Sequence, residues 1–239
     1  MKGPGNLFVS VIVAAAGRGS RMNMPINKLY MEIGDVPVLV RTLTAFQDCR
    51  LVNEIILVVN NEDILFCKQD IIDPYRLYKV KTITAGGSER QMSVYNGLLQ
   101  VNTKADIVMI HDGARPFIDE QGIARCVETA AEFGACTLAV RVKDTIKKAD
   151  DDGTVTQTVD RRNLWAIQTP QAFKYGLIME AHERARQDGF TGTDDTVLVE
   201  RIGKPVKLVE GSYRNIKITT REDLISAEGI VCADYKAYG

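Results

Sequence analysis

An apolar strand that runs straight into a glycine turn and a group of cations constrains this chain most. Residues 7–13 (LFVSVIV) lead into three alanines and then into Gly17 and Gly19, and Arg18, Arg21 and Lys28 lie in and after the turn. Small residues let the backbone approach a ligand closely, and glycine reaches dihedral angles that aim successive N–H groups at one anion. Arginine and lysine supply charge where phosphate oxygens would lie. The segment therefore predicts a polyphosphate site.

The turn does not match either of two well-known phosphate motifs. Gly17-x-Gly19 is followed by Met22 where the dinucleotide fingerprint has its third glycine, and the segment is not a G-x4-G-K-[ST] loop. The alternative interpretation is a plain strand-to-helix turn with solvated cations. Three cations close to the strand end favour phosphate binding over it.

Charge and composition exclude several other classes of function. The 239 residues carry a formal net charge of −1, so no basic field invites nucleic acid, and the cations must act locally. No apolar stretch reaches the roughly 18–20 residues that cross a bilayer, so we expect no membrane partner. Five scattered cysteines without C-x-x-C spacing predict reduced thiols in a cytoplasmic protein. Two histidines exclude a histidine-rich metal site.

Strand-like and helical segments alternate along the first half of the chain. Expected strands are 7–13, 54–60, 79–84, 106–110 and 136–142, and expected helices are 38–48, 62–72, 89–101 and 119–133. Continuous apolar strands separated by helices predict an α/β fold with a mostly parallel, Rossmann-like sheet covered on both faces. Ligands of such sheets lie beyond the carboxyl ends of the strands. The polar loops 14–28, 85–90 and 111–116 should therefore gather at one edge.

Residues 143–166 interrupt this alternation. Two polar flanks surround Asp150–Gly153, whose D-G step signals a hairpin, so we expect a projecting β-arm that packs against a partner. A loose surface hairpin is the alternative. Beyond the arm we expect a helix near 175–187, a helix from Thr193, strands at 205–210 and 214–219, and a closing helix from 221. No linker divides the chain, so residues 1–239 are expected to form one domain.

Two further loops carry residues suited to phosphate chemistry. GGSER (86–90) opens a helix whose N–H groups can hold polar ligand atoms, although Glu89 and Arg90 also suit a helix cap. In HDGARP, Asp112 can hold Mg²⁺ directly or through water and Arg115 can pair with an anion, or the two can form a buried ion pair that orders the turn. Lys217, inside the strand-like NIKIT, points towards a site.

Eight ordered segments together resemble the 2-C-methyl-D-erythritol 4-phosphate cytidylyltransferase family over roughly residues 8–228. They are AAAGRGSRM, Lys28, GGSER, HDGARP, TVDRRNLW, TPQAF, GTDDT and NIKIT. The resemblance implies a Rossmann-like nucleotidyltransferase fold and a homodimer formed through a projecting β-arm. It also implies transfer of CMP from CTP to a sugar-alcohol phosphate with Mg²⁺, releasing pyrophosphate, in the non-mevalonate isoprenoid pathway.

The same resemblance assigns roles to individual positions. Arg21, Lys28 and Lys217 would act in catalysis; Ala15, Ala16, Gly17, Gly86, Ser93 and Gly113 would line the nucleotide site; Asp112, Arg115, Thr145, Arg161, Thr169 and Thr193 would bind the methylerythritol phosphate. Asp112 would lie close to the metal, and Arg161 would reach into the neighbouring subunit. In one departure from the family pattern, Asn27 replaces the usual proline before Lys28.

Two other functions fit the same segments. A ribitol-5-phosphate cytidylyltransferase would share the nucleotide loops, although the AAAG start favours the methylerythritol enzyme. A non-catalytic nucleotide-binding module would share the fold, but Arg21, Lys28 and Asp112 are all present and argue against it.

Overall fold

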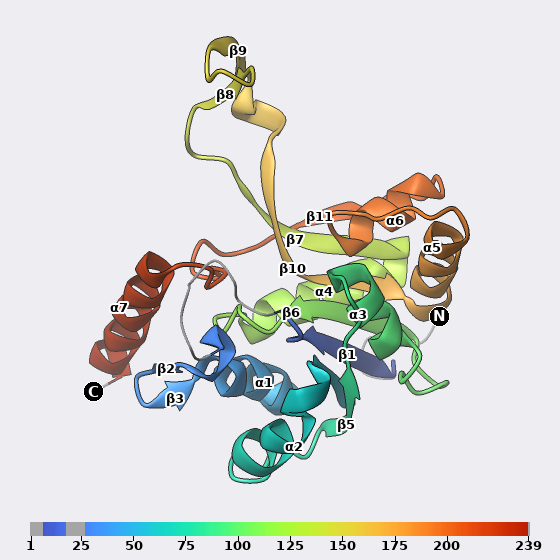
Figure 1. The fold of residues 1–239 in the computed structure, drawn as a ribbon, viewed down its shortest axis with the longest axis vertical. Helices are drawn as coiled ribbons and strands as arrows, with labels where there is room; N and C mark the ends of the chain where they lie inside the picture. The colour runs from blue at the N-terminus through green and yellow to red at the C-terminus, as the bar shows by residue number, and fades with distance from the viewer. Residues whose placement is uncertain (1–6, 18–26, 239) are drawn as a thin grey trace.

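One α/β sheet organises the part of the chain that the structure describes, and helices cover both of its faces (Figure 1). The computed structural model describes residues 7–17 and 27–238. In these ranges the large sheet has seven strands: β1 (Val9–Ala14), β4 (Glu54–Val59), β5 (Val80–Ala85), β6 (Ile107–Asp112), β7 (Ala135–Arg141), β10 (Trp165–Lys174) and β11 (Lys207–Glu210). Their order is β11-β7-β10-β6-β1-β4-β5. All neighbours run parallel except β10, which is antiparallel to β6 and β7.

The helices form a layer on each face of this sheet. They are α1 (Val38–Asp48), α2 (Ile64–Phe66), α3 (Arg90–Leu98), α4 (Glu120–Phe133), α5 (Tyr175–Gln187), α6 (Asp195–Arg201) and α7 (Arg221–Tyr238). Apolar residues of α1, α4 and α7 share one buried cluster, and those of α3, α5 and α6 share the other. None of the helices in the described ranges has the length and apolarity that a membrane crossing requires.

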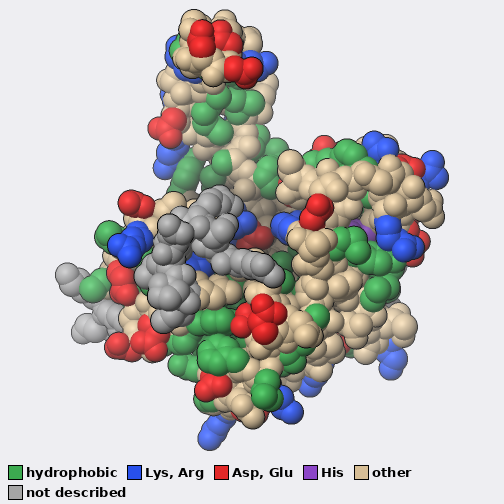
Figure 2. Space-filling model, in the orientation of Figure 1, with side chains coloured by type: hydrophobic (Ala, Val, Ile, Leu, Met, Phe, Trp, Pro, Cys, Tyr) green, Lys and Arg blue, Asp and Glu red, His purple; other side chains and the backbone are tan. Residues whose placement is uncertain are grey.

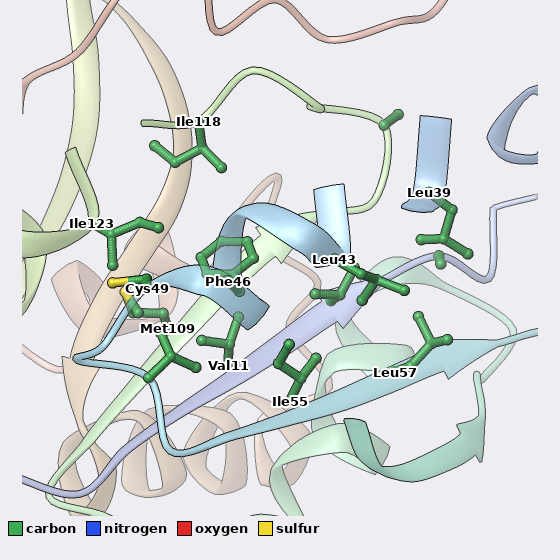
Figure 3. Close-up of a cluster of buried hydrophobic side chains, with 14 of the residues drawn as sticks. Val11, Leu39, Leu43, Phe46, Cys49, Ile55, Leu57, Met109, Ile118 and Ile123 are labelled. Atoms are coloured by element: carbon green, nitrogen blue, oxygen red, sulfur yellow. The ribbon is translucent and has the colours of Figure 1, made fainter. Parts of the chain in front are cut away.

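The core forms because the central strands are apolar on both faces. Leu43 and Phe46 of α1 pack over Val11 of β1, Ile55 of β4 and Met109 of β6 (Figure 3). Successive strand residues point to opposite faces, so a strand buried on both sides must be apolar at every position. This explains why the predicted strands agree with the observed ones within about two residues, and why the helices at 38–48 and 175–187 begin and end as predicted.

Two predicted elements were wrong. Residues 62–72 do not form one helix but a 3-10 turn (η4, Asn61–Asp63), the short α2 and a π-helical turn (η5, Cys67–Ile72), which brings Cys67 and Ile71 into the core. Residues 214–219 do not form a strand. Strand β6 already has β1 and β10 as neighbours, so the segment finds no free edge there, and it is joined to the loop after β6 by the backbone hydrogen bond from Ile218 N to Ala114 O.

Strand β10 was not predicted, although it lies between β6 and β7 in the sheet. Its middle carries Gln168, Thr169 and Gln171, which look like loop residues but are buried. The two glutamine side chains have hydrogen-bond partners from segments distant in sequence. Gln168 Nε2 donates to Ser212 O at 2.8 Å, and Gln171 Nε2 donates to an Asp194 carboxylate oxygen at 2.9 Å. The small hairpin of β2 (Glu32–Ile33) and β3 (Val36–Pro37) was also not predicted.

The predicted hairpin within 143–166 is present and projects away from the sheet (Figure 1). It consists of β8 (Ile146–Ala149) and β9 (Val155–Val159), followed by a 3-10 turn, η6 (Arg161–Asn163). Gly153 closes the hairpin with a φ of +87°, a left-handed conformation that glycine adopts without strain. Almost every hairpin residue is exposed, so the arm has no core of its own.

Candidate active site

A cavity of about 740 Å³ opens where the loops after β1, β4, β5 and β6 meet. Its lining residues among those described are Ala14, Ala15, Ala16, Gly17, Lys28, Leu29, Asn60, Gly87, Ser88, Glu89, Arg90, Ser93, Asp112, Ala114 and Lys217. Figure 2 shows basic and acidic side chains together in the hollow near the foot of the arm. The three loops expected at one sheet edge do gather there, as far as their residues are described.

The loop after β1, which carries Ala16, and the loop after β5, which carries Gly86, approach each other closely. A Cβ on Gly86 would collide with the Cβ of Ala16 and come within 2.8 Å of Ser93 Oγ, so only glycine fits. Ser93 Oγ accepts a hydrogen bond from Gly87 N and donates one to Glu89 O, both at 3.0 Å. Of the predicted nucleotide residues, Ala15, Ala16, Gly17 and Ser93 line the cavity, whereas Gly86 and Gly113 lie behind it.

Gly113 joins the loop after β6 to the loop after β1. Its N–H donates to Ala14 O at 2.9 Å, and its carbonyl accepts from Thr42 Oγ1 at 2.9 Å. An added Cβ would lie 3.2 Å from the Cβ of Ala15, which leaves little space for any side chain. The residue therefore supports the cavity wall from behind.

Asp112, at the end of β6, is the acidic centre of the cavity. Its carboxylate lies 2.8 Å from Lys217 Nζ, 3.5 Å from Arg115 Nε and 3.6 Å from Arg90 Nε. Burial alone would raise its pKa, but the attraction of Lys217, then Arg90 and Arg115, outweighs burial and holds the pKa well below its ordinary value. The carboxylate is therefore ionised at neutral pH.

A buried hydrogen-bond chain supports Asp112. Thr169 Oγ1 accepts from Asp112 N at 3.0 Å and lies 3.1 Å from His111 Nδ1, while His111 Nε2 lies 3.1 Å from Arg115 O. Burial lowers the pKa of His111 to about 4, so the ring is neutral at pH 7. Because a carbonyl only accepts, Nε2 carries the proton and Nδ1 accepts from the threonine hydroxyl.

The structure places the other predicted residues in three groups. Arg115 is not among the residues that line the cavity, and its Nη1 donates to Asn215 O at 2.8 Å, which ties the HDGARP turn to the segment that carries Lys217. Thr145 and Arg161 belong to the arm, and Arg161 Nη1 donates to Lys143 O. Thr193 is exposed on the loop before α6. Arg18 and Arg21 lie outside the described residues.

Lys28 lies in the cavity wall at the start of a 3-10 turn (η3, Lys28–Tyr30). Asn27 caps this turn, because its side-chain oxygen accepts from Leu29 N at 3.2 Å. The asparagine that departs from the family pattern therefore fixes the lysine-bearing turn by a hydrogen bond.

The donor set fits a magnesium ion that is held mainly by substrate. No cluster of three or more histidine, cysteine or acidic residues occurs in the described ranges, and the described carboxylates that line the cavity are those of Asp112 and Glu89. Mg²⁺ keeps several waters and is commonly bound by one or two carboxylates plus substrate phosphates. The nearest contacts of Lys217 and Arg115 are with Asp112 Oδ2, whereas Oδ1 lies 3.6 Å from Arg90 Nε, so Oδ1 is the oxygen better placed for such a cation.

Sequence analysis missed one set of charged residues at this site. Arg90 Nη1 lies 2.7 Å from Asp195 Oδ2, and His182 Nε2 lies 3.3 Å from Asp195 Oδ1. Asp195 and His182 are both buried. The sequence signal for this set was the pair of acids in GTDDT. Asp194 caps α6, which leaves Asp195 available for another role.

A doubly wound sheet with a small-residue turn, lysines and one carboxylate at the carboxyl ends of its strands is typical of a nucleotidyltransferase. A model of the 2-C-methyl-D-erythritol 4-phosphate cytidylyltransferase family matches residues 9–233. The chain belongs to this family.

Relatives and solved structures agree with this assignment. The chain is 54% identical over 222 residues to the 2-C-methyl-D-erythritol 4-phosphate cytidylyltransferase of Geobacillus kaustophilus, covering 93% of this chain and 96% of the relative. It is 49% identical to that of Caldanaerobacter subterraneus, covering 92% and 97%. The crystal structure of 4-diphosphocytidyl-2C-methyl-D-erythritol synthase from Anaerococcus prevotii superposes with a TM-score of 0.83 at 36% identity, covering 94% and 96%.

Proposed function

We propose that CTP and the acceptor phosphate meet in the cavity beside Asp112, and that Lys28 and Lys217, with Arg21, carry the transfer. As a member of its family, the chain transfers CMP from CTP to 2-C-methyl-D-erythritol 4-phosphate in the non-mevalonate isoprenoid pathway. The products are 4-diphosphocytidyl-2-C-methyl-D-erythritol and pyrophosphate. The observation that carries the site proposal is the placement of Lys28, Lys217 and the Asp112 carboxylate around a single cavity.

The reaction needs charge neutralisation and alignment more than proton transfer. An oxygen of the acceptor phosphate is already anionic and forms a bond to the α-phosphorus of CTP, while the bond from that phosphorus to the bridging oxygen breaks and pyrophosphate leaves. Lys28 and Lys217 oppose the repulsion between the two polyanions and stabilise charge that develops at the α-phosphate. Mg²⁺, when bound near Asp112, neutralises further charge on the triphosphate.

The nucleotide is held by the loops at the ends of β1 and β5. Ala15, Ala16 and Gly17 allow its close approach, and Ser93 fixes the loop that begins at Gly86. Gly113 supports the wall from behind. No global basic surface is needed, because Lys28, Arg90 and Lys217 line the cavity itself. Nucleic acid is not a proposed partner.

The acceptor site is completed by a second copy of the chain. Asp112, Arg115, Thr169 and Thr193 belong to the body of the domain, whereas Thr145 and Arg161 are carried on the exposed arm. An isolated two-stranded hairpin is marginally stable, and Val155 on the arm is 56% exposed. A homodimer in which each arm reaches the other subunit's cavity gives the arm a partner and brings Arg161 to the acceptor phosphate.

A mixed dimer tests this arrangement. Lys28→Ala and Arg161→Ala should each be nearly inactive alone, since both damage every site. If Arg161 acts across the interface, a heterodimer has one site with both lesions and one intact site. Equal co-expression should then restore about a quarter of wild-type turnover per dimer, as random pairing of subunits in a twofold assembly predicts. No restoration in verified heterodimers would place Arg161 in its own subunit's site.

A reducing, cytoplasmic environment is part of the same proposal. All five cysteines are free in the structure, and four of them are buried. One catalytic domain with a dimerisation arm at about 143–166 accounts for the seven-stranded sheet and the separate β8–β9 hairpin that the described residues form.

A related cytidylyltransferase would differ from this enzyme in its acceptor substrate. A ribitol-5-phosphate cytidylyltransferase would use the same nucleotide loops, and all the relatives reported above carry the methylerythritol name. Pyrophosphate release from CTP with each polyol phosphate distinguishes the two, and we expect turnover with the methyl-branched acceptor.

A further inference from the structure

Arg90, the first residue of α3, lies between two carboxylates that differ in their surroundings. Its Nη1 is 2.7 Å from Asp195 Oδ2, and its Nε is 3.6 Å from Asp112 Oδ1. Arg90 and Asp112 line the cavity, whereas Asp195 lies behind it with only 1% of its side chain exposed. One carboxylate therefore faces the ligand space, and the other holds the arginine from the interior.

Burying the Asp195 carboxylate costs free energy unless a positive group lies next to it. Burial alone would raise its pKa, but the attraction of Arg90, followed by contact with His182, outweighs burial and lowers the pKa. The His182 ring is itself buried and stands 3.3 Å from Oδ1, and Gln171 Oε1 accepts from Asp195 N at 3.1 Å. The carboxylate is thus ionised and fixed in place on a rigid support.

The two distances indicate which carboxylate controls the guanidinium. Attraction between unit charges weakens with separation, so the 2.7 Å contact with Asp195 outweighs the 3.6 Å contact with Asp112. The contact with Asp195 is made by Nη1 and the contact with Asp112 by Nε, and Arg90 lines the cavity, so its guanidinium can also donate to an anion there. Without Asp195, the guanidinium would close on Asp112 and compete there with Lys217.

The backbone next to Arg90 is held by the same part of the chain. Gln91 Nε2 donates to Phe190 O at 3.0 Å, and Gly192 N donates to Gln91 Oε1 at 2.8 Å. The loop before α6 therefore fixes the first turn of α3, while Asp195 at the start of α6 fixes the Arg90 side chain.

We propose that Asp195 is a positioning residue that holds the Arg90 guanidinium in the cavity wall for the triphosphate of CTP and keeps it from closing further on Asp112. His182 contacts the other oxygen of the Asp195 carboxylate and helps to hold it in place. This inference rests on the proposed function, because it takes CTP as the ligand.

The test is CTP binding to Asp195→Asn, measured by calorimetry without acceptor. Asparagine keeps the shape of the side chain but loses the charge, so the Kd for CTP should rise about tenfold or more, the scale for losing a charge-assisted contact. In steady state the KM for CTP should rise by more than kcat falls. Asp188→Asn is the matched control, because Asp188 pairs with Arg201 on the surface away from the cavity, and its Kd should stay at the wild-type value.

A double variant separates positioning from a general structural effect. If Asp195 acts through Arg90, then Arg90→Gln with Asp195→Asn should bind CTP no more weakly than Arg90→Gln alone. The double variant also keeps the charge balance, so it carries the test if Asp195→Asn does not fold. A wild-type Kd in folded Asp195→Asn, or losses that add in the double variant, would overturn the inference. Failure of the proposed function would appear differently, as absent turnover in the wild-type protein.

Discussion

Alanine in place of Lys28 is expected to lower kcat by about 100-fold or more, the scale for removing one preorganised donor to a transition state. Lys28 lies in the cavity wall, and Asn27 caps its turn independently of the lysine side chain. The substitution should therefore remove the ammonium group without unfolding the turn. Initial rates of pyrophosphate release at saturating CTP and acceptor measure the effect.

Two companion variants make the Lys28 result specific. Lys68→Ala removes an exposed lysine from η5, outside the cavity, and should leave kcat unchanged. Lys28→Arg keeps the positive charge and should recover part of the lost rate. A Lys28→Ala enzyme that turns over at the wild-type rate would remove this lysine from the mechanism.

Asparagine in place of Asp112 is expected to lower kcat/KM by about 100- to 1,000-fold. The carboxylate is shared by Lys217, Arg115 and Arg90, so the substitution leaves three cations without their common counter-ion. It also replaces the charged carboxylate that would meet Mg²⁺ by a neutral amide, whose oxygen is a weaker ligand. Because a partner is removed from a mostly buried group, the free energy of unfolding should fall by about 1–3 kcal/mol. Urea denaturation and the Mg²⁺ dependence of the rate are the measurements.

The comparison of stability with activity decides what Asp112 does. The backbone N–H of residue 112 still donates to Thr169 in the variant, so a folded protein is expected. Asp188→Asn serves as the control for loss of an exposed acid. If the Asp112 variant loses stability but keeps its activity per folded molecule, the carboxylate is only a structural ion pair.

The parallel strands could be predicted from sequence because burial on both faces requires an unbroken apolar run, as in β1 and β4. Strand β10 could not, because Gln168 and Gln171 are polar and their burial depends on partners distant in sequence. Residues 214–219 show the reverse error. Their alternation resembles a strand, but strand formation requires a free sheet edge, which a local pattern does not reveal.

Some residues of the candidate site could be predicted from the sequence, and others could not. Gly17, Lys28 and Asp112 were predicted from loops that follow strands, and Lys217 from its place inside a strand-like segment. The fold brings all four to one cavity. Arg90 was left between a helix cap and a ligand contact, because its role depends on Asp195, more than a hundred residues away in the chain. Arg161 lies on the arm, so its role depends on a second subunit and stays a proposal.

Turnover of two acceptors side by side tests the central claim most directly. The wild-type enzyme is supplied with CTP and Mg²⁺, together with either 2-C-methyl-D-erythritol 4-phosphate or ribitol 5-phosphate, and pyrophosphate release is followed. The account predicts strong preference in kcat/KM for the methylerythritol phosphate. Preference for ribitol phosphate would contradict the substrate assignment while leaving the fold and the nucleotide site intact, and no release with either acceptor would contradict the catalytic account itself.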